Sequence, residues 1–209
     1  MKTTVITGDD LSYAVEVFLS GGLVAVPTDT VYGLAGNGLD VDAVAKIYEV
    51  KGRPEVKPLI LLVPDIHAVE AVSAEIPETA RILSDAFWPG ALTLVLPRRD
   101  TVPDIVTAGG DTVGVRCPGH PKALEFLRLA GVPAAAPSAN ISDMPSPKSA
   151  EDVLAYFDGK IDCVVDGGEC KYGVESTIVS LVDGTYKIIR QGALPEKEIR
   201  RVLADIASR

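Results

Sequence analysis

The feature that most constrains this chain is the alternation of short apolar runs with stretches that keep the 3.6-residue period of a helix. The apolar runs predict strands at residues 3–7, 23–27, 58–63, 91–97, 112–116, 134–137, 162–166, 176–182 and 185–190. The helical stretches begin at Asp9, Asp40, Pro77, Pro121, Ser149 and Pro195. Such alternation favours an α/β fold, in which helices cover both faces of a mixed sheet.

Local rules predict how these elements begin, end and face the core. Asp9 and Asp40 are expected to cap helices, and Asp183-Gly184 is typical of a two-residue hairpin between the last two strands. The expected core-facing residues are Val41, Val44, Ala45, Ile47 and Tyr48 in the second helix, and Ile199, Val202, Leu203 and Ile206 in the last.

Composition narrows the class of protein. The 209 residues contain no repeat or long linker, so we expect one domain over 1–209, with its core at about 10–192 and a C-terminal helix at about 195–207. A formal net charge of −9 disfavours stable binding of nucleic acid through its phosphates. No apolar run is long enough to span a membrane, and the first residues lack a signal-peptide core.

Several common sites are absent from the sequence. It contains no G-x-x-x-x-G-K-[ST] loop, no G-x-S-x-G elbow and no dinucleotide fingerprint. The histidines are His67 and His120, too few for the usual triads or transition-metal sites. Three cysteines without C-x-x-C spacing predict neither a disulfide framework nor a zinc site, and favour a cytoplasmic location.

Polar segments follow or end the predicted strands, where ligands bind in open α/β sheets. They are residues 27–34, 51–58, 112–118, 137–142 (extended to Ser146), 173–179 and 189–192. Segment 27–34 offers hydroxyls, a carboxylate and a tyrosine, or forms a turn in which threonine and aspartate bond the local backbone. Segment 137–142 offers free amides that can cradle phosphate oxygens, or forms a capped turn.

The cations in these segments allow two interpretations each. Lys51, Arg53 and Lys57 stand within seven residues, and they either contact phosphates or form a solvated loop balanced by acidic neighbours. Arg116 ends an apolar strand, where its planar fork either grips a ligand carboxylate or forms a structural ion pair.

Taken in order, the stretches PTDTVYGL, KGRP with KPLI, VRCPGHP, APSANISDMPSP, GVESTIV and IIRQGALP resemble the YrdC domain family, whose characterised members are threonylcarbamoyl-AMP synthases. The resemblance runs from about residue 10 to the C-terminus. It implies a YrdC-like twisted mixed sheet with an open central cleft. It also implies that L-threonine, bicarbonate or CO₂ and ATP give threonylcarbamoyl-AMP and pyrophosphate, and that a tRNA threonylcarbamoyl transferase uses the product for t6A37.

The resemblance also implies which residues surround each substrate. Those around L-threonine are Thr30, Tyr32, Arg116 and Ser176, with Ala136 contributing backbone. Those around ATP are Lys51, Arg53, Lys57, Thr112, Ser138, Asn140, Ser146 and Arg190. The substrate's own carbamate is the nucleophile, so no catalytic side chain is expected beyond electrostatic roles for Lys51 and Arg53. Mg²⁺ is expected to bind mainly through phosphates, without assigned protein ligands.

Two departures and two alternatives accompany the resemblance. Longer members carry a histidine where this chain has 60–62, and this chain resembles the short single-domain type, so we expect a more exposed cleft. One alternative is a non-catalytic RNA-binding or ribosome-maturation factor, which the net charge disfavours. The other is a carbamoyl-adenylate enzyme related to hydrogenase maturation, whose members carry further domains.

Overall fold

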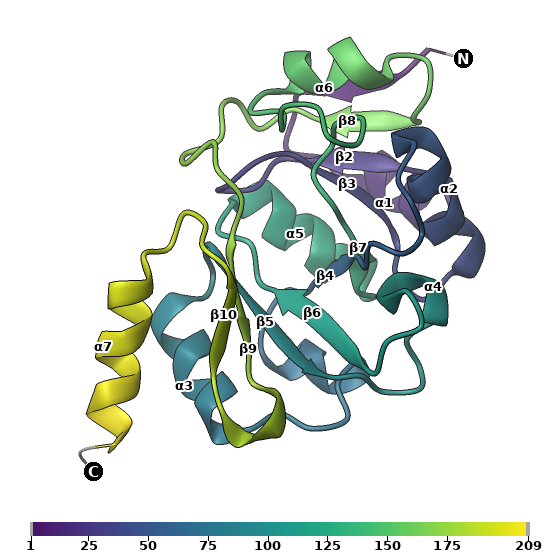
Figure 1. Cartoon of the computed structure of the whole chain (residues 1–209). Coiled ribbons are helices and arrows are strands. Elements are labelled where there is room, and N and C mark those ends of the chain that lie inside the picture. The colour runs from purple at the N-terminus through teal and green to yellow at the C-terminus, as the bar shows by residue number, and fades with distance from the viewer. Residues whose placement is uncertain (1, 208–209) are drawn as a thin grey trace.

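The computed structural model describes residues 2–207, and within them ten strands form one mixed sheet flanked by helices, which confirms the predicted fold class (Figure 1). The strands are β1 (Thr4–Ile6), β2 (Val24–Val26), β3 (Gly33–Asn37), β4 (Ile60–Leu62), β5 (Leu92–Pro97), β6 (Thr112–Arg116), β7 (Ala134–Ala135), β8 (Cys163–Val165), β9 (Thr177–Ser180) and β10 (Lys187–Arg190). The helices are α1 (Ser12–Leu19), α2 (Val41–Lys51), α3 (Glu78–Phe87), α4 (Asp104–Thr107), α5 (Pro121–Ala130), α6 (Ala150–Phe157) and α7 (Glu196–Ala207), with 3₁₀ turns at His67–Ala71 and Val182–Gly184. The strand order is β1-β8-β2-β3-β7-β4-β6-β5-β9-β10.

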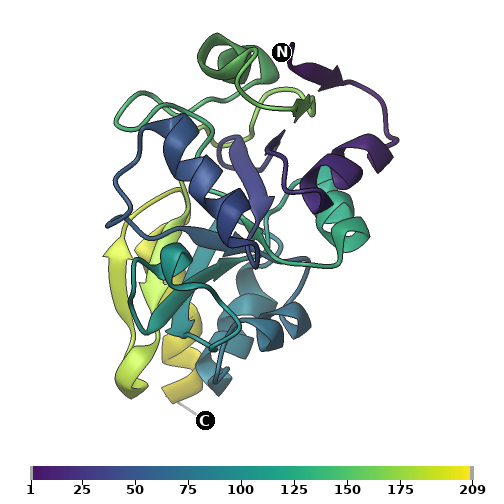
Figure 2. The same ribbon diagram turned by 90° about the vertical axis from the view of Figure 1, so that its right-hand side faces the viewer.

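Two apolar clusters cover the two faces of the sheet, because successive strand residues point to opposite sides. Val24 and Val26 pack with Phe18 of α1 and Phe126 of α5, whereas Ala25 joins the cluster that contains α2 and α6. The two phenylalanine rings meet edge to face at 5.1 Å. Figure 2 shows α1 and α5 together on one side of these strands and α2 on the other.

Several helix ends are fixed by the residues that the sequence indicates. The Asp40 carboxylate accepts from the backbone N–H groups of Asp42 and Ala43, and the Ser149 hydroxyl accepts from that of Asp152. Gly52 follows α2 with φ of 57°, in the left-handed region that suits a residue without Cβ. The turn ends α2 after Lys51, and the chain continues as a loop through residues 52–58 to β4.

Strand β3 was not predicted, and close packing explains why it exists. It contains Gly36, at which an added Cβ would lie 3.1 Å from side-chain atoms of Ile47 and Leu23. Gly38, just beyond it, would place a Cβ 2.6 Å from Leu61. Local propensity disfavours glycine in strands, but here glycine allows α2 and β4 to approach the backbone.

Four smaller expectations were wrong or lie outside the described residues. Asp10, not Asp9, accepts from the N–H of Ser12 at the start of α1. Val41 is exposed, and Ala43 faces the core in its place. Strands β9 and β10 pair antiparallel as predicted, but the 3₁₀ turn and its flanking residues replace the expected two-residue hairpin. The side chain of Ile206 lies outside the residues whose burial is described.

The topology brings several loops to one place. β4 and β6 are parallel, so their last residues, Leu62 and Arg116, are neighbours. β5 runs antiparallel to β6 and parallel to β9, which places the residues before Thr177 at the same end of the strands as Arg116. The loop after β7 continues into an isolated bridge between Ser138 and Gly33. None of the helices described in residues 2–207 is both long and apolar enough to cross a membrane.

Candidate functional site

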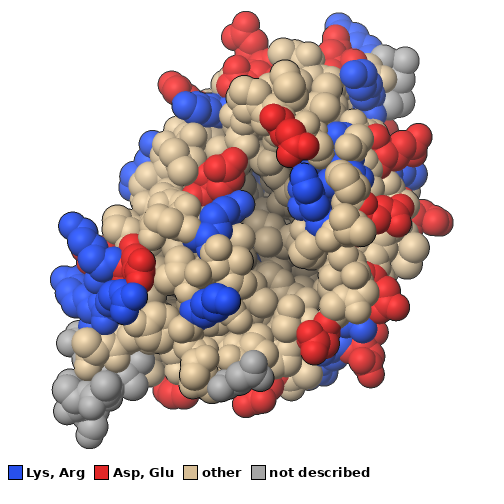
Figure 3. All heavy atoms as spheres, viewed as in Figure 1, with Lys and Arg blue, Asp and Glu red and all other residues tan. Residues whose placement is uncertain are grey.

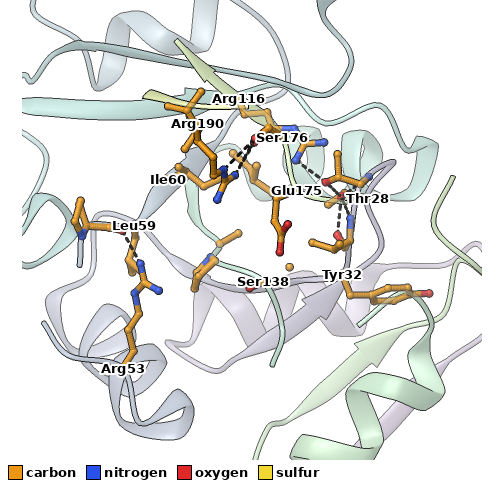
Figure 4. A pocket seen from close by; sticks show the side chains of 18 residues that line it. Thr28, Tyr32, Arg53, Leu59, Ile60, Arg116, Ser138, Glu175, Ser176 and Arg190 are labelled. Atoms are coloured by element: carbon orange, nitrogen blue, oxygen red, sulfur yellow. Dashed lines mark hydrogen bonds between the residues drawn. The ribbon is translucent and has the colours of Figure 1, made fainter. Parts of the chain in front are cut away.

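A cleft of about 340 Å³ opens where these loops meet. Figure 3 shows it as a hollow in one face of the molecule, with Lys and Arg atoms on both sides. Its polar lining residues are Thr28, Thr30, Tyr32, Arg53, Arg116, Ser138, Glu175, Ser176 and Arg190. Each of the six polar segments contributes at least one of them, and Arg116 is the last residue of β6 (Figure 4). The separate segments therefore converge on one site.

Arg116 forms a buried ion pair at the inner end of the cleft. Its Nη2 lies 2.6 Å from Oδ1 of Asp29, and the two side chains are 4% and 6% exposed. Its Nη1 donates to the Thr30 hydroxyl at 2.8 Å, and its Nε donates to the Gly90 carbonyl at 2.9 Å. A guanidinium has five N–H donors, and residues of the described chain use three of them, so two are left for a ligand. Both interpretations of Arg116 from the sequence are thus compatible with this geometry.

The segment after β2 forms the self-bonded turn that the sequence allowed. The Thr28 hydroxyl donates to the Val31 carbonyl at 2.6 Å and lies 3.0 Å from the hydroxyl of Thr30. Tyr32 has no exposed surface, and its hydroxyl donates to the Gly168 carbonyl at 2.8 Å. Burial raises the pKa of Tyr32 to about 12, so it stays protonated at neutral pH. Its hydroxyl points away from the cleft, which leaves the rest of the residue to line the wall (Figure 4).

The opposite wall is built from β9 and β10. Arg190 donates through Nε and Nη2 to the Ser176 carbonyl, at 3.2 and 2.9 Å, and the Ser176 hydroxyl lies 2.7 Å from that of Thr93. Gly192 packs directly on this backbone, because a Cβ there would lie 2.3 Å from the Glu175 carbonyl oxygen. Glycine is therefore required for residues 189–192 to hold Arg190 at the cleft.

The loop after α2 brings one of its three cations to the cleft. Arg53 lines the cavity and donates to the carbonyls of Lys57 and Pro58, at 3.2 and 3.0 Å. Partial burial lowers its pKa from the ordinary value. Lys57 lies on the exposed rim, 3.3 Å from Asp143. The loop is therefore folded on itself rather than freely solvated.

Lys51 lies behind the cleft wall, not in it. It is 1% exposed, and its ammonium donates to the carbonyl oxygens of Ser138 and Asn140. Burial, with a smaller contribution from the nearby charge of Arg53, lowers the pKa of Lys51 to about 7. No carboxylate forms a salt bridge with it among residues 2–207. Lys51 thus fixes the loop that carries Ser138.

The remaining predicted ATP residues surround this loop. Asn140 is 5% exposed, and its amide donates to the carbonyls of Ile141 and Met144, which leaves Oδ1 without a partner within the described residues. Thr112 starts β6 and shares a strand face with Arg116, four residues away. Ser138 lines the cleft, whereas Thr112, Asn140 and Ser146 do not.

Glu175 is a cleft residue to which the sequence reasoning gave no role. It is the one acidic side chain among the lining residues of the described chain. Its Oε1 accepts from the Ser146 hydroxyl at 2.6 Å, which lowers the pKa of Glu175 and keeps it ionised at neutral pH. The signal is present in the sequence, because Glu175 lies in the polar segment 173–179, directly before Ser176.

The cysteines and histidines take no part in the cleft lining. Burial raises the pKa of Cys117 and Cys163 to about 12 and that of Cys170 to about 11, so all three thiols are protonated and poor nucleophiles. They are unpaired and buried. Across residues 2–207, no three His, Cys, Asp or Glu side chains gather as a metal site.

The geometry defines a class of protein: an α/β domain whose central cleft collects arginines and hydroxyls for anionic ligands. Residues 16–192 match the Sua5/YciO/YrdC family model, described as telomere recombination. The chain belongs to this family, as the motifs indicated.

Named relatives agree with this assignment. The chain is 50% identical to the threonylcarbamoyl-AMP synthase of Pyrococcus abyssi over 89% of its own length and 55% of the relative's. It is 46% identical to the enzyme of that name from Bacillus subtilis, over 94% of this chain and 57% of the relative. The chain thus spans little more than half the length of these curated relatives.

A solved structure of the same family superposes closely. The crystal structure of P. abyssi Sua5 complexed with L-threonine has a TM-score of 0.94 and 45% identity to this chain. The match covers 97% of this chain and 61% of the other. The shared fold therefore includes the part of the chain that forms the cleft.

Proposed function

We propose that this chain makes threonylcarbamoyl-AMP from L-threonine, bicarbonate or CO₂, and ATP, which classes it as a nucleotidyltransferase. The observation that carries the proposal is the convergence of Arg53, Arg116 and Arg190 on one cleft from three distant parts of the sequence. The names of its relatives, and the L-threonine bound by P. abyssi Sua5, support the choice of substrates.

The inner end of the cleft suits an amino acid. The two uncommitted N–H groups of Arg116 can bind the α-carboxylate, with the hydroxyls of Thr30 and Ser176 close by. Asp29 keeps the guanidinium in place from behind. Ile60 and Leu62 line the cleft where longer members carry a histidine, and Tyr32 and the Ala136 backbone complete this end.

The outer part suits ATP. Arg53 and Arg190 provide cations on opposite walls, and Ser138 supplies a hydroxyl and backbone amide between them. Lys51 acts through the loop of Ser138 and Asn140. The Oδ1 of Asn140 has no partner within residues 2–207 and can accept a hydrogen bond. Three further ATP contacts stay predictions: Lys57 lies at the rim, Thr112 lies on β6, and Ser146 lies beside Glu175.

The proposed reaction needs no nucleophile from the protein. The threonine amine and CO₂ form a carbamate, with loss of one proton from nitrogen. A carbamate oxygen then bonds to the α-phosphorus of ATP while the bond to pyrophosphate breaks. The chain's contribution is to align the two substrates and to stabilise negative charge with fixed cations. This matches a cleft lined by arginines rather than by thiols or imidazoles.

Mg²⁺ is proposed to accompany ATP. The cleft offers hard oxygen donors, a carboxylate and hydroxyls, which is the ligand chemistry that Mg²⁺ prefers. When bound, it neutralises charge on the phosphates and favours departure of pyrophosphate. Phosphate oxygens and water would provide most of its ligands.

The product is proposed to pass to a tRNA threonylcarbamoyl transferase in the cytoplasm. The direct test of the synthase is mass detection of threonylcarbamoyl-AMP, with threonine, bicarbonate and ATP each omitted in turn. We expect the product when all three are present and in no other mixture. Product formed without threonine, or ATP left unconsumed in the full mixture, would refute the proposal.

A further inference from the structure

One carboxylate lies in a cleft that is otherwise cationic. Glu175 faces the same hollow as Arg53, Arg116 and Arg190 (Figure 4). Its Oε1 accepts from the Ser146 hydroxyl at 2.6 Å. Within the described chain, no other residue donates a hydrogen bond to Oε2, and the carboxylate forms no salt bridge. One oxygen is therefore held in place while the other is available to a ligand.

The position of this charge conflicts with direct binding of a triphosphate. A carboxylate that faces phosphate oxygens repels them, and the low dielectric of a half-buried cleft strengthens the repulsion. The conflict disappears if a divalent cation lies between the two groups. Mg²⁺ commonly binds one or two carboxylates together with substrate phosphates and water.

The neighbours of Glu175 place it on the side proposed for ATP. Burial lowers the pKa of Arg190, and the negative charge of Glu175 nearby partly offsets this lowering, so the two side chains are neighbours. Ser146, which fixes the carboxylate, is also a predicted ATP contact. The ion pair of Arg116, at the amino-acid end, is made with Asp29 instead.

We propose that Glu175 is the protein ligand of the Mg²⁺ ion that enters this cleft with ATP. The proposal rests on the proposed function, because it requires ATP to bind here. It assigns one carboxylate oxygen to the metal and leaves the other with Ser146.

The test compares ATP binding with and without metal. The dissociation constant of ATP is measured by calorimetry for the wild type, Glu175→Gln and the control Glu169→Gln, in Mg²⁺ and in EDTA. Glu169 is an exposed acid outside the cleft lining. In Mg²⁺ we expect Glu175→Gln to weaken ATP binding roughly tenfold, and in EDTA to strengthen it, because the repulsion is gone. Glu169→Gln should change neither value.

A second variant separates the effect of the negative charge from that of the position of the carboxylate oxygen. Glu175→Asp keeps the negative charge but withdraws the oxygen, so it should bind ATP like the wild type in EDTA and lose the benefit of Mg²⁺. Circular dichroism and thermal melting check that each variant is folded.

Other results overturn the inference. An equal loss in both conditions would mean that Glu175 acts on the structure of the cleft. Unchanged ATP binding together with weaker binding of L-threonine, titrated in the same calorimeter, would mean that Glu175 accepts the ammonium of the amino acid. If the wild type binds ATP in neither condition, the proposed function itself fails, and that outcome is distinct from both.

Discussion

Two buried cations border the cleft, and their charges are balanced in opposite ways. Arg116, at the end of β6, is 4% exposed and pairs with Asp29. Lys51, at the end of α2, is 1% exposed, and within the described chain its ammonium donates only to the carbonyls of Ser138 and Asn140. One cation is neutralised by the protein, whereas the other is solvated only by dipoles.

The difference indicates two kinds of contribution. A buried charge is costly unless it is paired, so the pair of Arg116 and Asp29 belongs to the architecture of the cleft. The cost at Lys51 shows in its pKa, which burial lowers to about 7. An anion arriving near Ser138 would supply the missing opposite charge. We therefore expect Lys51 to matter more for ATP binding than for folding, and Arg116 the reverse.

The largest expected effect is that of Arg116→Ala. It leaves Asp29 buried without its partner, and breaking a buried ion pair costs about 3–5 kcal/mol of unfolding free energy. Urea denaturation measures this loss. In the double variant with Asp29→Ala the loss should be much smaller than the sum of the two single losses. Additive losses would show that the pair is not the stabilising unit.

Lys51→Met tests whether the second buried cation contributes to ATP binding rather than to stability. Removal of the ammonium leaves two carbonyls unsatisfied, at about 1–3 kcal/mol each, but also removes a charge whose burial is of comparable cost. We expect the free energy of unfolding to change by less than about 2 kcal/mol, and ATP affinity to fall roughly tenfold. Calorimetry with ATP and urea denaturation give the two values. A large loss of stability with ATP binding intact would reverse the assignment.

The pH dependence follows from the lowered pKa of Lys51. Its ordinary value is 10.5 and its value here is about 7, so between these the unfolded chain holds a proton that the folded chain has lost. Stability relative to Lys51→Met should therefore rise with pH across this window. A polyanion favours the protonated lysine, so ATP binding should take up a proton and weaken as pH rises above about 7. The measurement is the ATP dissociation constant against pH, and an equal slope in Lys51→Met would contradict it.

Local patterns predicted most of the sheet but not β3, whose backbone is closely packed at Gly36. Apolar runs such as 23–27 and 112–116 became strands, and Asp40 and Ser149 cap helices as their types indicate. Strand β3 is not predicted because Gly36 is favourable only when Ile47 of α2 and Leu23 pack against it, which is tertiary information.

In the site, too, the sequence indicates which residues matter but not the direction in which each side chain points. The motifs identified the segments that meet in the cleft, and Arg53, Arg116 and Arg190 line it as a group. No pattern in residues 51–58 reveals that Lys51 points into the fold while Arg53 points to the cavity. That choice depends on carbonyls from a loop more than 80 residues away.

The smallest expected effect is that of Lys57→Ala, which extends the comparison of Arg116 and Lys51 to an exposed cation. Lys57 pairs with Asp143 across 3.3 Å, but the side chains are 46% and 82% exposed. Such a pair contributes about 0–1 kcal/mol and is screened by salt, so urea denaturation should show little change in stability. Because folding is unaffected, any loss of ATP affinity reports a direct contact between this lysine and the nucleotide. A stability loss as large as that of Arg116→Ala would mean that exposure does not determine which cations hold this cleft together.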